Sequence, residues 1–188
     1  MPTDAPLVDV FRDRALWVFM GNVALAIIKQ RTERGEFLPG STGGSAYSRV
    51  PAPIGTDMVN QIGLAKLQAL VDKEDPEAWW IMTKSGQALI ILEGGYEKLR
   101  ELAGKSTTVN LAWTGAMMRG LKITQVMPGG VPGVDIGWSD PDLARIGRYH
   151  NELGAGRSKV TRKFVGMTEA EVSQASDEMT KRLSGKLN

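Results

Sequence analysis

The residue types that carry chemistry are few in this chain. It has one histidine, His150, and no cysteine. Without cysteine the chain has no disulfide, no thiol nucleophile and no thiolate metal ligand. A serine nucleophile needs an elbow-like turn, and no G-x-S-x-G motif occurs. We therefore interpret His150 as a packed or hydrogen-bonded residue near the end of a helix, and we expect no enzymatic activity.

Acidic residues also have structural explanations. Asp135, Asp140 and Asp142 lie close in sequence, but they straddle the end of one predicted strand and the start of a helix. Asp140 suits the cap of that helix. Glu169 and Glu171 suit the first turn of another helix, where negative charge is favourable. The sequence therefore predicts neither a metal site nor a bound cofactor.

The most basic stretch lies between residues 145 and 163, around a glycine-rich loop. Its cations are Arg145, Arg148, Arg157, Lys159, Arg162 and Lys163. Contacts to phosphate need only such cations. Three interpretations stay open: a solvated loop, a contact to another protein, and a contact to the DNA backbone. The net charge of +2 is too small to indicate a dedicated nucleic-acid binder.

A long helix is the first element that must support these residues. From Val10 onward, Leu16, Met20, Val23 and Ile27 repeat at helical spacing. Cations in its last turns complement the helix dipole, and we interpret them as solvated, with contact to DNA phosphate as the alternative. These cations are Lys29, Arg31 and Arg34.

The middle of the sequence begins with a predicted loop at residues 37–56, rich in Gly, Ser and Pro. Both mobility and a subunit or partner contact are open for it. Its GSTGG run lacks the Lys-Ser/Thr and the preceding strand of a phosphate-binding loop. Helical spacing follows at residues 58–71 and again at 96–103.

A hairpin is predicted between those two helices, from Trp79–Met82 and Ala88–Leu92. Neighbouring residues of a strand point to opposite faces, so Trp79 and Trp80 cannot both face one core. One of them is expected on a second packing surface, under a covering helix or at an oligomer interface.

The last third of the sequence carries the densest structural signals. Strands are predicted over 109–113, 121–127, 134–138 and 162–167, and helices over 116–121, 141–152 and 168–183. Asp140 and Pro141 suit a helix start, and Gly154 suits its end. Thr168 and Glu171 fit a capping box that opens the final helix. We expect this helix to lie on the sheet, with a neighbouring subunit as the alternative.

These elements predict an α+β fold: an antiparallel sheet of hairpins packed against a long N-terminal helix and further helices, with long loops. At 188 residues the chain is long enough for one core. We expect a single domain, 1–188, with a short arm at 1–9 and the long loop at 37–56. No apolar run approaches the roughly 18 residues of a membrane span, and the start lacks a signal-peptide layout, so we expect no membrane partner.

Three segments in the second half carry a family resemblance. They are TGAMMRGL, IGWSDPDLARIGRYHNELGAG and RKFVGMTEAEV. In this order they resemble the phage virion-morphogenesis family, the tail-completion or neck proteins of Mu-like and related tailed phages. The resemblance extends from about Ala15 to the C-terminus. One departure is Thr161, where the family usually has a proline.

The resemblance implies a structural protein of the head-to-tail connector, made in the host cytoplasm and located in the virion neck. It implies a homo-oligomeric ring, a hexamer, that joins tail to head around the DNA channel. Its partners would be adaptor or stopper proteins and the tail terminator, with non-specific DNA contact in the channel. Alternatives are a tail terminator or head-closure ring and, in another class, a small DNA-binding accessory protein.

A closed ring needs a heterologous interface, in which two different faces of each subunit meet. We expect one face around Trp79, Trp80 and the 37–56 loop, where the resemblance places aromatic residues similar to Phe37 and Tyr47. The other face is expected around the loop at 154–163. Its candidate residues are Arg157, Lys159, Arg162 and Lys163.

Overall fold

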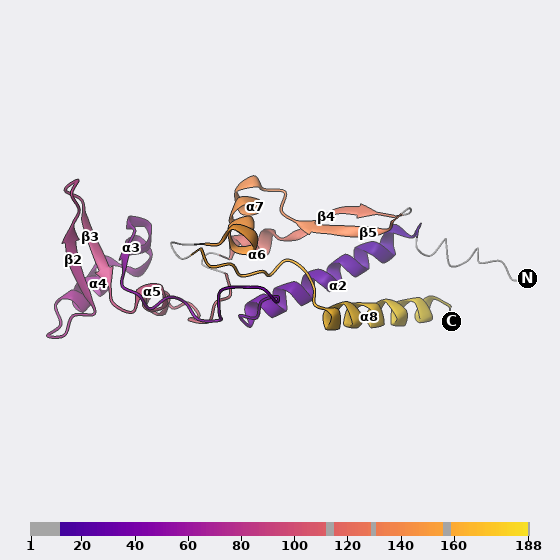
Figure 1. The fold of residues 1–188 in the computed structure, drawn as a ribbon, viewed down its shortest axis with the longest axis horizontal. Helices are drawn as coiled ribbons and strands as arrows, with labels where there is room; N and C mark the ends of the chain where they lie inside the picture. The colour runs from indigo at the N-terminus through magenta and orange to yellow at the C-terminus, as the bar shows by residue number, and fades with distance from the viewer. Residues whose placement is uncertain (1–11, 112–114, 129–130, 156–158, 188) are drawn as a thin grey trace, which may run out of the picture. The chain divides into compact units, whose positions relative to one another are not determined.

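The computed structural model describes residues 12–111, 115–128, 131–155 and 159–187, and it has the predicted α+β fold with small antiparallel sheets (Figure 1). The predicted arm at 1–9 and the candidate Arg157 lie outside the described residues, and so does Thr114, whose residue type would suit a cap for the helix predicted at 116–121. Contacts divide the chain into two compact units: unit 1 is Met1–Gly44 with Asn110–Asn188, and unit 2 is Ser45–Val109. That the two units fold together as one domain stays a prediction.

In unit 1, helix α2 (Arg14–Glu33) lies between a two-stranded hairpin and helix α8 (Glu169–Leu187) (Figure 1). The hairpin joins β4 (Lys122–Met127) to β5 (Gly133–Gly137), as predicted. A Cβ at Gly21 of α2 would lie 2.6 Å from a side-chain carbon of the hairpin, so the helix crosses the strands very closely.

The sequence had suggested that the final helix lies on the sheet. This prediction is wrong. The helix packs against α2, because α2 already occupies the face of the hairpin that it would need. Burial on two sides also explains why the apolar stripe of α2 is wide. Among the described residues, no helix has both the length and the apolar character needed to cross a bilayer.

Two short helices flank the hairpin in sequence. Helix α6 (Ala116–Gly120) precedes β4, and helix α7 (Pro141–Arg148) follows β5. The predicted cap of α7 is confirmed, since the Asp140 carboxylate accepts hydrogen bonds from the backbone N–H groups of residues 142 and 143, at 2.8 and 3.1 Å. The helix continues as one π-helical turn, η1 (Tyr149–Leu153), and ends at Gly154 with φ +83°.

The core of unit 1 forms where these helices meet α2. Its buried members are Ile28, Met117, Met118, Leu121 and Phe164. Half-buried side chains pack around them, among them Trp138 and Phe37. The core thus draws on both ends of the sequence, 136 positions apart.

Two predicted strands are absent. Described residues 109–111 form no strand, and Leu111 has φ +53°, a left-handed conformation that breaks strand geometry. Residues 162–167 are also outside any strand. Their backbone partners are a loop and side chains rather than a neighbouring strand, as described below.

Unit 2 contains a three-stranded antiparallel sheet in the order β1-β3-β2. Its strands are β1 (Ala52–Ile54), β2 (Ala78–Met82) and β3 (Ala88–Leu92), and its helices are α3 (Thr56–Ile62), α4 (Leu64–Val71) and α5 (Gly95–Leu102). The predicted β2–β3 hairpin is confirmed. The predicted loop at 37–56 is wrong at β1, and the predicted helix at 58–71 is broken at Gly63, whose φ is +94°.

The two ends of unit 2 lie side by side. The backbone N–H of Val109 donates a 2.8 Å hydrogen bond to the carbonyl of Ser45, and Ala46 forms an antiparallel bridge with Thr108. The chain therefore leaves unit 1 and returns to it through one paired stem.

Candidate interaction surface

The three segments that carry the family resemblance meet in the core of unit 1. Trp138, from the second segment, donates its indole N–H to the carbonyl of Met117, from the first, at 2.8 Å. Its ring also meets Phe164, from the third, edge to face with centroids 6.0 Å apart. A Cβ at Gly147 would lie 2.3 Å from the Trp138 ring, so only glycine lets α7 approach it.

The π-helical turn η1 replaces the missing strand partner of residues 162–167. The Asn151 side-chain oxygen accepts hydrogen bonds from the backbone N–H groups of Phe164 and Val165, at 2.8 and 3.1 Å. The carbonyl of His150 accepts the backbone N–H of Arg162 at 2.7 Å. Single π turns inside helices often mark places where a side chain must be aimed. Here the turn aims Asn151 at a backbone segment, which is a structural task.

Arg31 ties the same segment to α2. Only 4% of it is exposed, and it pairs with Glu171 at 2.5 Å. Its guanidinium also donates to the carbonyls of Phe164 and Gly166, at 2.6 and 3.0 Å. Interpreting Arg31 as a solvated cation was therefore wrong. The signal that could have found it is its position four residues after Ile27, which continues the apolar stripe of the helix.

The predicted capping box at the start of α8 is confirmed. The Glu171 carboxylate accepts the backbone N–H of Thr168 at 2.7 Å, and the Thr168 hydroxyl accepts the backbone N–H of Glu171 at 3.3 Å. Glu171 therefore caps its own helix and neutralises Arg31 with one carboxylate.

The sole histidine is half-buried. Burial lowers the pKa of His150 from its ordinary value, and the nearby positive charge of Arg162 lowers it further. In the described part of the chain, no three His, Asp or Glu side chains gather in a way that could hold a metal ion. Asp140, one of the three aspartates considered, acts as a helix cap.

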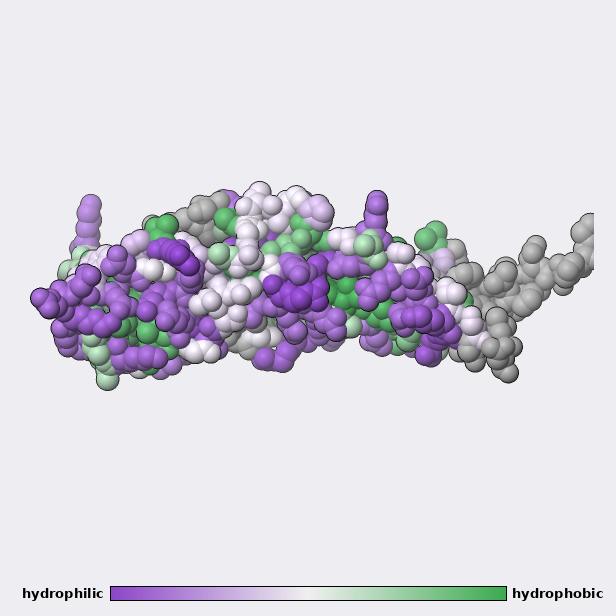
Figure 2. Space-filling model, turned by 90° about the horizontal axis from the view of Figure 1, so that it is seen from below, coloured by the Kyte–Doolittle hydropathy of each residue, from purple (hydrophilic) through white to green (hydrophobic). Residues whose placement is uncertain are grey.

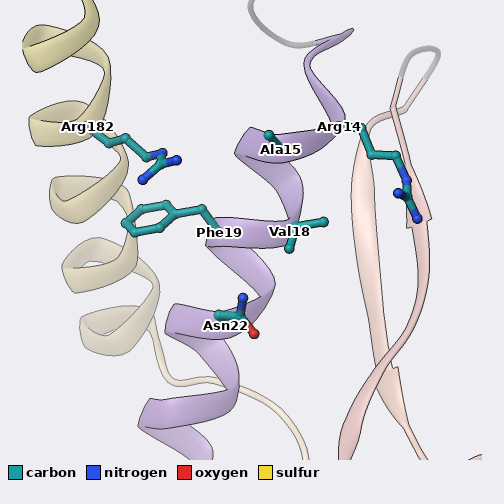
Figure 3. A pocket seen from close by; sticks show the side chains of 6 residues that line it. All are labelled: Arg14, Ala15, Val18, Phe19, Asn22 and Arg182. Atoms are coloured by element: carbon teal, nitrogen blue, oxygen red, sulfur yellow. The ribbon is translucent and has the colours of Figure 1, made fainter.

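A hollow of about 600 Å³ lies along α2 beside α8. Arg182 of α8 lies over the ring of Phe19, 4.4 Å from its centre, while Arg14 extends on the other side of α2 (Figure 3). On the molecular face seen in Figure 2, green hydrophobic residues stand in small groups between purple hydrophilic ones. The polar side chains of the hollow diverge, so the hollow is a groove and has no focused binding site.

The basic stretch is partly neutralised. Arg145 pairs with Asp142 at 3.0 Å and Arg148 with Glu152 at 3.2 Å. Lys159 is exposed, and its φ of +51° places it in the left-handed region. The cationic surface available to phosphate is therefore smaller than the sequence suggests.

The remaining two cations lie against another loop. The half-buried Arg162 donates from Nε to the carbonyl of Gly44 at 3.4 Å. The ammonium of half-buried Lys163 lies 3.1 Å from the position that a Cβ at Gly40 would take. The Arg162 side chain thus bonds to the 38–44 loop, and the Lys163 side chain lies beside it.

The 38–44 loop is hydrogen-bonded to residues 161–163, at the start of the predicted strand that is absent. Leu38 N–H donates to the carbonyl of Lys163 at 2.7 Å, and the N–H groups of Thr42 and Gly43 donate to that of Thr161 at 3.1 and 3.0 Å. From the sequence, these two loops were expected on two different faces of a subunit. The structure brings residues 38–43 and 161–163 together in unit 1, whereas residues 45–56 of the predicted loop belong to unit 2.

The two aromatic residues expected in the loop are packed. Phe37 lies against the core of unit 1. In unit 2, the Tyr47 ring meets Tyr96 edge to face at 5.1 Å and lies under the guanidinium of Arg100 at 4.6 Å. Both residues therefore have a structural role already.

Strand β2 is the most exposed apolar element. Trp79 is 37% exposed, Trp80 44% and Met82 70%, whereas Ala78 is fully buried. Neither tryptophan lies in a core, so both remain available for a partner. Of the predicted interface residues, these two keep the character that an interface requires.

The comparisons with known proteins find no relative. No family model, no curated protein and no solved structure matches the chain.

Proposed function

We propose that this chain is a structural protein of the head-to-tail connector of a tailed phage, of the tail-completion type. It would form a ring, a hexamer, around the DNA channel, with neck adaptor or stopper proteins and the tail terminator as partners. It would act in the virion neck without catalysis, after synthesis in the host cytoplasm.

The observation that supports this proposal is the meeting of the three resemblance segments at one packed centre. Trp138 touches both of the other segments, and Asn151 binds the backbone of the third. Residues that recur for the sake of a shared scaffold are expected to pack on one another in this way. Their polar groups serve caps and backbone contacts, as a structural protein needs.

Particles made without this protein test the proposal. We expect heads filled with DNA and separate tails, seen by negative-stain electron microscopy, with infectivity lost. Adding the purified protein to such an extract should restore joined particles. Joined, infectious particles in its absence would overturn the proposal.

The position of the protein in the particle separates the related functions. A tail terminator would be found on isolated tails, and a head-closure ring on isolated heads. Labelled antibody imaged on each purified fraction distinguishes them. Free tails that carry the protein and cannot join heads would favour the tail-completion type.

DNA contact is a separate part of the proposal. Exposed cations such as Lys159 could meet phosphates in the channel without reading sequence. Weak binding to duplex DNA that falls steeply with salt and is independent of sequence is expected in a mobility-shift assay. Tight or sequence-selective binding would instead favour the accessory DNA-binding protein.

A further inference from the structure

Strand β2 is an edge strand without a charged residue, a proline or a bulge, and helix α4 packs against it. It lies at one end of the order β1-β3-β2, and it pairs with β3 over its whole length. Its sequence, AWWIM, has no proline and no charged residue. Edge strands of monomeric proteins are generally blunted by charge, proline or a bulge, because an open edge is a template for another strand.

Hydrogen bonds at the two ends of the hairpin show which backbone groups of β2 face β3. Glu93 N–H donates to the carbonyl of Glu77 at 2.8 Å, and Thr83 N–H donates to that of Gln87 at 2.9 Å. In an antiparallel ladder only every second residue bonds to its partner strand. The odd-numbered residues of β2 are therefore the ones that bond to β3.

The even-numbered residues present their backbone to the open edge. The N–H and C=O groups of Ala78, Trp80 and Met82 point away from β3, and the last two side chains are exposed. A second strand would gain backbone hydrogen bonds and apolar contact at the same place.

We propose that this edge pairs with the same edge of a second copy of the chain, antiparallel about a two-fold axis, with Trp80 opposite Trp80. In this register all five residues of both strands are paired. Trp79 then lies opposite Ile81 of the second copy in a pair without mutual hydrogen bonds, where side chains approach most closely. Aromatic and β-branched residues in such pairs are stabilising.

The charges at the two ends of β2 select the second copy as the occupant. Acidic Glu74 and Asp75 precede the strand, and Lys84 follows it. An antiparallel pair brings Lys84 of each copy beside the acidic residues of the other, whereas a parallel pair would place like charges together. Within the part of the chain that the structure describes, none of these three side chains makes an ion pair, so all are available.

This contact is isologous, and it differs from the heterologous contact that closes a ring. It rests on β2 alone and does not depend on the function proposed above. A ring whose assembly ignores β2 would leave the neck proposal standing and overturn this one.

Solution mass is the first test. Light scattering coupled to gel filtration, over a range of concentrations, should show a species of twice 20.4 kDa in equilibrium with the single chain. Trp80→Lys places two like charges on the axis and should raise the dissociation constant about thirtyfold or more. Val131→Lys, at another highly exposed apolar residue, is the matched control and should leave it unchanged.

Cross-linking tests the register and does not rely on the charged variant. The chain has no cysteine, so Trp80→Cys introduces a unique thiol, with Cα atoms about 5.5 Å apart across the axis, within disulfide reach. Met82→Cys is the control, because its two copies would lie roughly 13 Å apart. Mild oxidation should link the first variant and leave the second unlinked. A single-chain mass at every concentration, equal effects of the two lysine variants, or linkage of only the Met82→Cys variant would overturn the proposal.

Discussion

Arg31 joins parts of unit 1 that are far apart in sequence. It extends from α2 to the start of α8 and to the backbone between residues 164 and 166. A buried charge is tolerated only when it is paired and hydrogen-bonded, and Glu171 supplies the pairing. Removing either partner therefore lowers the free energy of unfolding by more than the net attraction of the pair contributes.

Removing the carboxylate of Glu171 should destabilise unit 1 strongly. Glu171→Ala leaves Arg31 buried without its countercharge and removes half of the capping box, so we expect a loss of roughly 3 kcal/mol or more in the free energy of unfolding. Urea denaturation followed by circular dichroism measures it. Glu169→Ala, exposed in the same turn, should change stability by less than about 0.5 kcal/mol. Similar losses in both variants would contradict a buried pair.

His150 should make stability depend on pH. Burial and the charge of Arg162 lower its pKa below the ordinary 6.5, so the unfolded chain binds a proton that the folded chain refuses. The free energy of unfolding is therefore not reduced by His150 above about pH 6.5. It decreases as the pH falls from there toward the lowered pKa of His150 in the folded protein. This residue is the sole histidine, so no other imidazole titrates in this window.

Urea unfolding at about pH 7.5 and about pH 5.5 measures this dependence. The free energy of unfolding should be lower at the acidic value, and His150→Gln should flatten the difference. An equal difference in the variant would assign the effect to other groups.

At the scale of elements, α7 reaches the core because it has glycine where it crosses Trp138. Alanine normally stabilises a helix interior relative to glycine by about 1 kcal/mol. Gly147→Ala should instead destabilise by roughly 1–3 kcal/mol, because its Cβ would overlap the indole ring. Thermal unfolding gives the sign. The control is Gly137→Ala, whose Cβ would meet Thr124 at an ordinary 3.8 Å. Stabilisation by Gly147→Ala would show that the ring moves freely.

Elements defined by local signals were predictable from the sequence. Both hairpins, the Asp140 cap and the Thr168–Glu171 capping box follow from residues within a few positions of one another. The failures arise where distant residues decide. The 162–167 segment was predicted as a strand, but Asn151 and the 38–43 loop take its backbone hydrogen bonds.

The candidate interface was predictable in part for the same reason. Trp79 and Trp80 stand on a strand that local pattern identifies, and they are exposed. Phe37 and Tyr47 were expected beside them, but tertiary partners pack both: the core of unit 1 for Phe37, and Tyr96 with Arg100 for Tyr47. Composition alone cannot distinguish an aromatic residue of a loop that is packed from one that is free.

At the scale of the molecule, the two ends of unit 2 are paired, so we expect unit 1 to fold when a short linker replaces unit 2. Replacing residues 46–108 by a short glycine linker should leave a cooperative unfolding transition, because Ser45 and Val109 are already within hydrogen-bond distance at 2.8 Å. Its dependence on denaturant should be smaller, since less surface is exposed on unfolding. Residues 45–109 alone form the companion sample. Loss of any cooperative transition in the shortened chain would show that the two units fold as one domain.

The layering of unit 1 has a consequence for the order of events during synthesis. Helix α2 leaves the ribosome well before β4, β5 and α8, against which it packs, because those elements begin at residue 122 or later. Unit 2 is completed in between. Helix α2 must therefore wait, its apolar sides uncovered, until residues 122 and beyond emerge, and a nascent-chain chaperone would find a target there.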